Sequence, residues 1–95
     1  MKFIYVLKPP RVNFPDTITT KESEIISEHF DYLKKLTENK VVFLAGRCND
    51  ASFGICIFDA EDEEKAKDIM NNDPSVQKKV FTAELKEFSI ALLRE

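Results

Sequence analysis

With 95 residues and a net charge of −3, the chain is the size of one domain and lacks the basic excess that nucleic-acid binding requires. Its hydrophobic share of 43%, which includes eight phenylalanines, is enough for one core and excludes a disordered chain. No apolar stretch approaches the roughly 20 residues that span a bilayer, and the N-terminus does not resemble a signal peptide. We therefore expect one cytoplasmic domain over residues 1–95, with neither nucleic acid nor membrane as a partner.

The first part of the chain predicts a strand, a loop and a long helix. Residues 2–8 are β-branched and aromatic without a helical period, which is typical of a buried strand. Residues 11–18 contain turn-forming residues and are predicted to be a loop. Thr19 and Glu22 have the spacing of a capping box, so the main helix is expected over residues 19–39, with its last asparagine in the left-handed conformation.

A hairpin is predicted to follow. Residues 41–48 are apolar almost throughout, which indicates a strand buried on both faces. Gly46, near the end of this strand, suggests a bulge or a close backbone approach. Residues 52–60 are expected to form the partner strand.

The last part of the chain predicts a second helix and a final strand. Asp62 is expected to cap a helix over residues 63–72. Asp73 and Pro74 should end that helix, because the residue before a proline avoids the α region. Residues 80–91 are expected to form the last strand, with alternating exposure in its first half.

This order of elements predicts a ferredoxin-like βαββαβ α+β fold, with a four-stranded antiparallel sheet and both helices on one face. The other face would be bare. Yet simple alternation puts Val41, Phe43 and Ala45 on one face of their strand and Val42 and Leu44 on the other, so both faces are apolar. An uncovered apolar face is typical of a partner site, and a second copy of the sheet would cover it as a dimeric α+β barrel. We therefore expect a homodimer through the open sheet face.

His29, the only histidine, is the first candidate for chemistry. It lies four residues after Ile25 and four before Leu33, so it is the polar member of an apolar helix stripe. An imidazole suits acid–base work near neutral pH when a carboxylate orients it. Asp73, at the end of the second helix, and Asp50, in the hairpin turn, are both candidates for that carboxylate.

Arginine, cysteine and glycine motifs are the remaining candidates for substrate, metal or cofactor binding. Arg47, beside Gly46, could bind an anionic small-molecule substrate. Cys48 and Cys56 have no activating base nearby in the pattern and are expected to be reduced thiols. No histidine or cysteine has metal-ligand spacing and no glycine-rich phosphate loop is present, so we expect neither a metal nor a cofactor.

Several short motifs follow one another along the chain: His29-Phe30-Asp31-Tyr32-Leu33, Ala45-Gly46, a loop containing Asp50, Gly54, Asp62-Glu63-Glu64-Lys65-Ala66, Asp73-Pro74 and Phe88. Their order and spacing, from about Phe3 to Phe88, resemble the YciI-like (YCII-related) family of small dimeric proteins. The chain departs from the family pattern at Arg47, where proline is usual, and at Ser75, where an aromatic residue is usual.

The resemblance implies a dimeric α+β barrel similar to muconolactone isomerases, with a pocket in which His29 and Asp73 form a catalytic pair. Arg47, Asp50 and Gly46 complete the predicted pocket as substrate-binding residues. Lyase or dehydrohalogenase-type chemistry on small, often aromatic or hydroxylated molecules is associated with the family. The alternative hypothesis is a non-catalytic dimeric module that binds a small ligand or supports another protein, in which His29 is structural.

Overall fold

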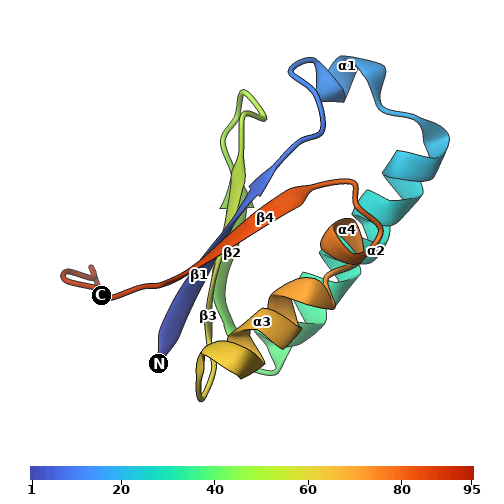
Figure 1. The fold of residues 1–95 in the computed structure, drawn as a ribbon. Helices are drawn as coiled ribbons and strands as arrows, with labels where there is room; N and C mark the ends of the chain where they lie inside the picture. The colour runs from blue at the N-terminus through green and yellow to red at the C-terminus, as the bar shows by residue number, and fades with distance from the viewer.

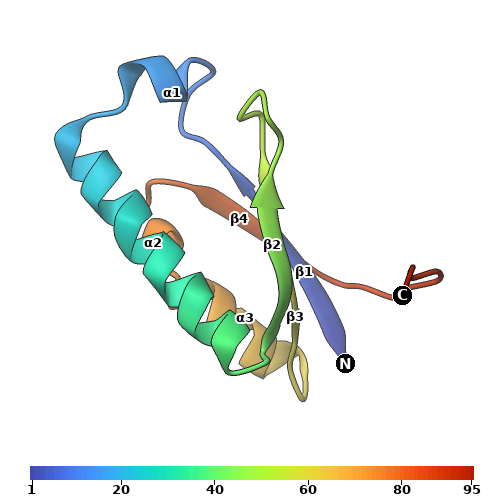
Figure 2. The same cartoon turned by 180° about the vertical axis from the view of Figure 1, so that it is seen from behind.

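The computed structural model describes residues 1–95 and contains one four-stranded antiparallel sheet with its helices on one side (Figures 1 and 2). The elements in chain order are β1 (Lys2–Lys8), α1 (Phe14–Thr17), α2 (Thr20–Glu38), β2 (Val42–Arg47), β3 (Gly54–Asp59), α3 (Glu63–Asn71), α4 (Pro74–Gln77) and β4 (Thr82–Glu87). The strand order is β2-β3-β1-β4, and all neighbouring pairs are antiparallel. The predicted ferredoxin-like fold is confirmed.

The core lies between the two central strands and the helices. Phe3 pairs with Phe58 and Tyr5 with Cys56 across β1 and β3, and none of these four side chains is more than 1% exposed. The ring of Tyr5 meets that of Phe58 edge to face, with centroids 5.6 Å apart. Because Tyr5 is fully enclosed, its hydroxyl needs a partner inside the protein.

Helix α2 begins as its capping residues predict. The Thr19 hydroxyl accepts from the Glu22 backbone N–H at 3.1 Å, and the Glu22 carboxylate accepts from the Thr19 N–H at 2.9 Å. Its end differs from the prediction: Asn39 has a φ of −84°, and the left-handed residue is Lys40, with a φ of 63°. The backbone N–H of Asn39 instead donates to carbonyls of the last helical turn, so the left-handed residue that ends the helix comes one position later.

The segment predicted as a loop contains the short helix α1 and is anchored to α2. Pro15 lies in the first turn of α1, where its missing N–H costs no hydrogen bond. The Arg11 guanidinium donates to both carboxylate oxygens of Glu22, at 2.7 and 2.9 Å. This bidentate pair lowers the pKa of Glu22 to about 2.

Strand β2 lies at the edge of the sheet and contains an irregularity, so two predictions for it are wrong: burial on both faces and strict alternation of its side chains. Val42 pairs with Phe58, but Leu44 pairs with Ile57, so the register shifts between them. Strict alternation predicts Val42 and Leu44 on one face; the shift instead puts Val42 and Ala45 on the helix-covered face and Leu44 on the open one. Only Val42 of this strand is buried, since an edge strand has one neighbour.

The bulge predicted near Gly46 is therefore earlier in the strand. A close backbone approach does occur, but at Gly54 on the partner strand. A Cβ atom at Gly54 would lie 3.1 Å from the carbonyl oxygen of Gly46, whereas one at Gly46 would meet nothing within 4 Å.

The region after β3 is partly as predicted. Asp62 caps α3 by accepting a backbone N–H of the first turn at 2.8 Å. Asp73 and Pro74 follow the end of α3, but Asp73 also caps a further one-turn helix, α4, by accepting from the Ser75 N–H at 2.9 Å. The last strand is shorter than expected, at residues 82–87 rather than 80–91, and keeps the predicted alternation of exposure.

The sheet face opposite the helices is uncovered in the single chain (Figure 2). Ile4 and Val6 of β1 and Ile55 of β3 lie there, beside Leu44, which is 42% exposed. The two cysteines are free: Cys56 is buried and Cys48 is half-buried. None of the helices combines the length and the apolar character needed to cross a membrane.

Candidate active site

The fold brings His29 against Asp73, which is 44 residues away in the sequence. His29 lies in the middle of α2, and Asp73 lies at the junction of α3 and α4, with α4 packed beside α2. The Nδ1 atom of His29 is 2.8 Å from each carboxylate oxygen of Asp73. Asp50 accepts its own turn's Ser52 N–H at 3.0 Å, so it holds the hairpin turn and does not contact the imidazole.

The carboxylate of Asp73 is fully buried, and both of its oxygens accept hydrogen bonds. The Tyr5 hydroxyl donates to Oδ2 at 2.8 Å. The Ser75 hydroxyl and backbone N–H both donate to Oδ1, at 2.8 and 2.9 Å. We call Tyr5, Asp73 and Ser75, together with Nδ1 of His29, the back network.

These bonds determine the charge of the back network. Burial by itself raises the pKa of Asp73, but hydrogen bonds from His29, Ser75 and Tyr5 outweigh it and hold that pKa below its usual value. Burial, with the nearby thiol and carboxylate, raises the pKa of Tyr5 far above its ordinary value, so the phenol remains a donor. Asp73 is thus an ionised carboxylate in a dry site.

The ionised carboxylate decides which nitrogen of His29 is available. A neutral imidazole facing Asp73 carries its proton on Nδ1, which leaves the lone pair on Nε2. Nε2 has no hydrogen bond within the protein, although every fully buried side-chain nitrogen or oxygen has a partner. Nε2 therefore reaches solvent, while the ring packs edge-on against Phe81 with centroids 5.8 Å apart.

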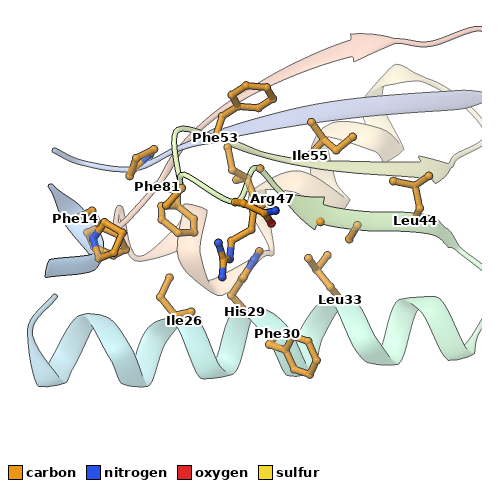
Figure 3. Close-up of a pocket in the computed structure, with 18 of the residues that line it drawn as sticks. Phe14, Ile26, His29, Phe30, Leu33, Leu44, Arg47, Phe53, Ile55 and Phe81 are labelled. Carbon is orange, nitrogen blue, oxygen red and sulfur yellow. The ribbon is translucent and has the colours of Figure 1, made fainter. Parts of the chain in front are cut away.

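His29 opens into a cleft of about 1150 Å³ between α2 and the β2–β3 hairpin (Figure 3). Most of its walls are apolar: they include Leu7, Phe14, Ile18, Ile26, Phe30, Leu33, Phe53 and Phe81. We call this space the front cleft. It is large enough for a small organic molecule, for which pockets of roughly 300–1,000 Å³ are usual.

The other predicted pocket residues, Arg47, Asp50 and Gly46, all line the front cleft, whereas Asp73 lies behind His29. Arg47 extends from the end of β2 toward the helix that carries His29 (Figure 3). Its guanidinium donates to the carbonyl of Cys48 at 3.3 Å. Gly46 contributes backbone and leaves open space where a side chain would be.

Comparison with known proteins decides the family. A model of the YCII-related domain matches residues 1–89. This chain belongs to the YCII-related family. A search of curated proteins found no significant match.

Among solved structures, the YCII-related chain is similar to 5-chloro-2-hydroxyhydroquinone dehydrochlorinase from Burkholderia phenoliruptrix, determined in complex with 2,5-dihydroxybenzoquinone. The TM-score is 0.71, the sequence identity is 17%, and the alignment covers 94% of each chain. At this identity the likeness establishes the shared fold.

The hydroxyl and thiol side chains beside the His29–Asp73 contact are buried and protonated. The Ser75 hydroxyl, which lies 3.2 Å from Nδ1 of His29, is buried and donates to Asp73. Burial raises the pKa of the Cys56 thiol to about 12, which leaves it protonated. No three histidine, cysteine or acidic side chains gather where they could hold a metal ion.

Sequence reasoning missed two members of the back network. Tyr5 carries the one polar side-chain atom on the buried face of β1, and a buried hydroxyl requires a partner. Ser75 lies two residues after Asp73, at the spacing of a capping interaction. These local signals indicate that each residue needs a partner, but they do not identify His29 as a neighbour.

Proposed function

We propose that this protein is a cofactor-independent enzyme in which His29 and Asp73 transfer a proton to or from a small organic molecule in the front cleft. One observation carries the proposal: Nδ1 of His29 contacts a buried, ionised carboxylate while Nε2 is free on the cleft side. Asp73 would fix the tautomer and stabilise the imidazolium. A positioned base of this kind contributes roughly 10²–10⁴ in rate.

The reaction class that fits best is an elimination of the lyase or dehydrohalogenase type. Nε2 takes a proton from a C–H or a ring hydroxyl, the freed electron pair forms the new C=C or C=O bond, and the leaving group departs from a saturated carbon with its bonding pair. In a chlorinated hydroxyaromatic ring the keto tautomer, protonated at the chlorine-bearing carbon, supplies that saturated carbon. Two observations support this class: the apolar walls of the cleft suit a planar ring, and a protein of the same fold is a dehydrochlorinase solved with a dihydroxybenzoquinone. Arg47, Asp50 and the backbone of Gly46 are the proposed substrate contacts.

A homodimer through the open sheet face is part of the proposal. The exposed apolar side chains of that face, such as Leu44 beside Ile55, are what a second sheet would cover. Light scattering of the purified protein is expected to report twice the chain mass of 11.0 kDa.

The proposed enzyme is tested by changing His29→Gln, which removes the imidazole base and retains a polar side chain. Wild-type protein is offered a panel of halogenated hydroxyaromatic compounds that includes 5-chloro-2-hydroxyhydroquinone, and chloride release is measured by ion chromatography. Exchange of substrate C–H for deuterium is followed by NMR. We expect His29→Gln to lower the rate by about 10²–10⁴.

The matched control is Glu24→Gln, an exposed position on the same helix, which should keep the wild-type rate. A panel that binds but shows neither chloride release nor exchange, together with a His29→Gln variant that loses only stability, would favour the non-catalytic binding module.

A further inference from the structure

The three arginines of the chain differ in what they contact. Arg11 is saturated by the carboxylate of Glu22 and by Thr17. Arg94 lies in the exposed C-terminal segment. Arg47 lines the front cleft and forms no ion pair, so its guanidinium retains donors for a ligand.

The strand register aims Arg47 at the cleft and leaves space around it. Arg47 pairs with Gly54 on β3, so its side chain lies on the same face as the missing side chain of that glycine. A Cβ atom at Gly54 would lie 3.7 Å from Cβ of Arg47. The glycine therefore removes the cross-strand neighbour that would otherwise pack against Arg47.

The remaining charges of the cleft do not neutralise Arg47. Besides Arg47 and His29, the acidic and basic side chains that line the cleft are Lys34, Glu38 and Asp50. The carboxylate of Asp50 accepts the Ser52 N–H in its own turn and forms no ion pair with Arg47. Glu38 is the last residue of α2, nine residues after His29. Apolar walls strengthen the interaction of an unpaired guanidinium with an anion, because they displace the water that would screen it.

We infer that Arg47 binds the anionic group of a small planar acid, a carboxylate or an ionised hydroxyl, whose ring lies between the apolar walls. The planar fork of a guanidinium matches two such oxygens. With the anion on Arg47, the proton-bearing atom of the ligand faces Nε2 of His29. The catalytic half of this arrangement rests on the proposed function, whereas the anion contact rests on Arg47 alone.

The test uses two pairs of simple rings that differ in charge and little in size: benzoate with benzamide, and phenylacetate with phenylacetamide. Dissociation constants are measured by NMR shift titration. Wild-type protein is expected to prefer each anion about tenfold, the effect of one charge-assisted contact. Arg47→Gln should remove most of that preference and leave amide binding unchanged, and Arg47→Lys should retain part of it. Arg94→Gln, which changes the net charge equally outside the cleft, should behave as wild type.

Several outcomes would overturn the inference: equal affinity of the wild type for anion and amide, no detectable binding of either anion in the millimolar range, or loss of the preference in Arg94→Gln as well. These titrations and the proton-transfer assay test the anion site and the proposed enzyme independently. An Arg47-dependent preference in a protein whose proton transfer does not depend on His29 would retain the anion site and reject the enzyme; the converse would retain the enzyme and reject the anion site.

Discussion

The two sides of His29 are built in opposite ways. Behind the imidazole, the back network buries Asp73 completely and pairs both of its oxygens. On the other side, the front cleft has exposed walls such as Phe30 and Phe53, 66% and 42% exposed, and an arginine with one weak contact. One ring nitrogen is therefore held rigidly, while the other faces a surface that can adapt to a ligand.

The elements that supply each side explain this difference. The back network joins the central strand β1 to the α3–α4 junction, so its residues are packed from several directions. The front cleft is bounded by the edge strand β2 and its hairpin, which has no further strand beside it. Changes at the back should therefore appear first in stability, and changes at the front in binding.

The largest stability effect is expected from Asp73→Asn. The amide group would direct N–H donors at the donors of Tyr5 or Ser75, and the imidazole would lose its carboxylate. Removing a buried carboxylate that accepts several hydrogen bonds should lower the free energy of unfolding by about 3 kcal/mol, measured by urea denaturation. Asp62→Asn, at an exposed helix cap, is the control and should cost a few tenths of a kcal/mol at most, because asparagine caps helices as well as aspartate does. Equal losses in the two variants would contradict the comparison.

A smaller effect is expected from Tyr5→Phe, which keeps the ring in the core and removes one donor from Asp73. The free energy of unfolding should fall by about 1–2 kcal/mol. Tyr32→Phe is a matched control, since the Tyr32 hydroxyl donates to the Ile69 carbonyl at 2.7 Å, outside the back network. We expect the two variants to lose similar stability, but only Tyr5→Phe to slow His29-dependent proton transfer. If both variants retained the wild-type rate, the network would have no role in positioning His29.

The smallest effect concerns acid stability, because protonation removes the charge of a carboxylate but not its side chain. The pKa of Asp73 is lower in the folded protein than its ordinary value, so below about pH 4 the unfolded chain binds more protons and stability falls as the pH falls. Glu22, with a pKa of about 2, acts in the same direction. Urea denaturation along a pH series should show a shallower acid loss in Asp73→Asn and in Glu22→Gln. An unchanged acid dependence in both variants would refute this assignment.

Much of the fold could be predicted because its signals are local. The capping pair of Thr19 and Glu22, the cap at Asp62 and the alternation along β4 all act over a few residues, and each appears in the structure as expected. Errors occur where a neighbouring element overrides the local pattern. The bulge between Val42 and Leu44 defeats simple alternation, because it depends on pairing with β3.

For the site, the helical period alone puts His29 on the buried stripe of a long helix, and the short motifs indicate the YCII-related family. The residue pattern left Asp73 and Asp50 both open, and the resemblance favoured Asp73. The packing of α4 against α2 brings Asp73 to His29, and the fold adds Tyr5 and Ser75 as the donors that hold its carboxylate. The contacts of His29 and of Tyr5 with Asp73 join residues 44 and 68 positions apart, whereas Ser75 is only two residues from Asp73. Helical and strand periods extend over one element, so contacts between distant elements leave no repeating pattern in the sequence and appear only when the sheet and helices pack together.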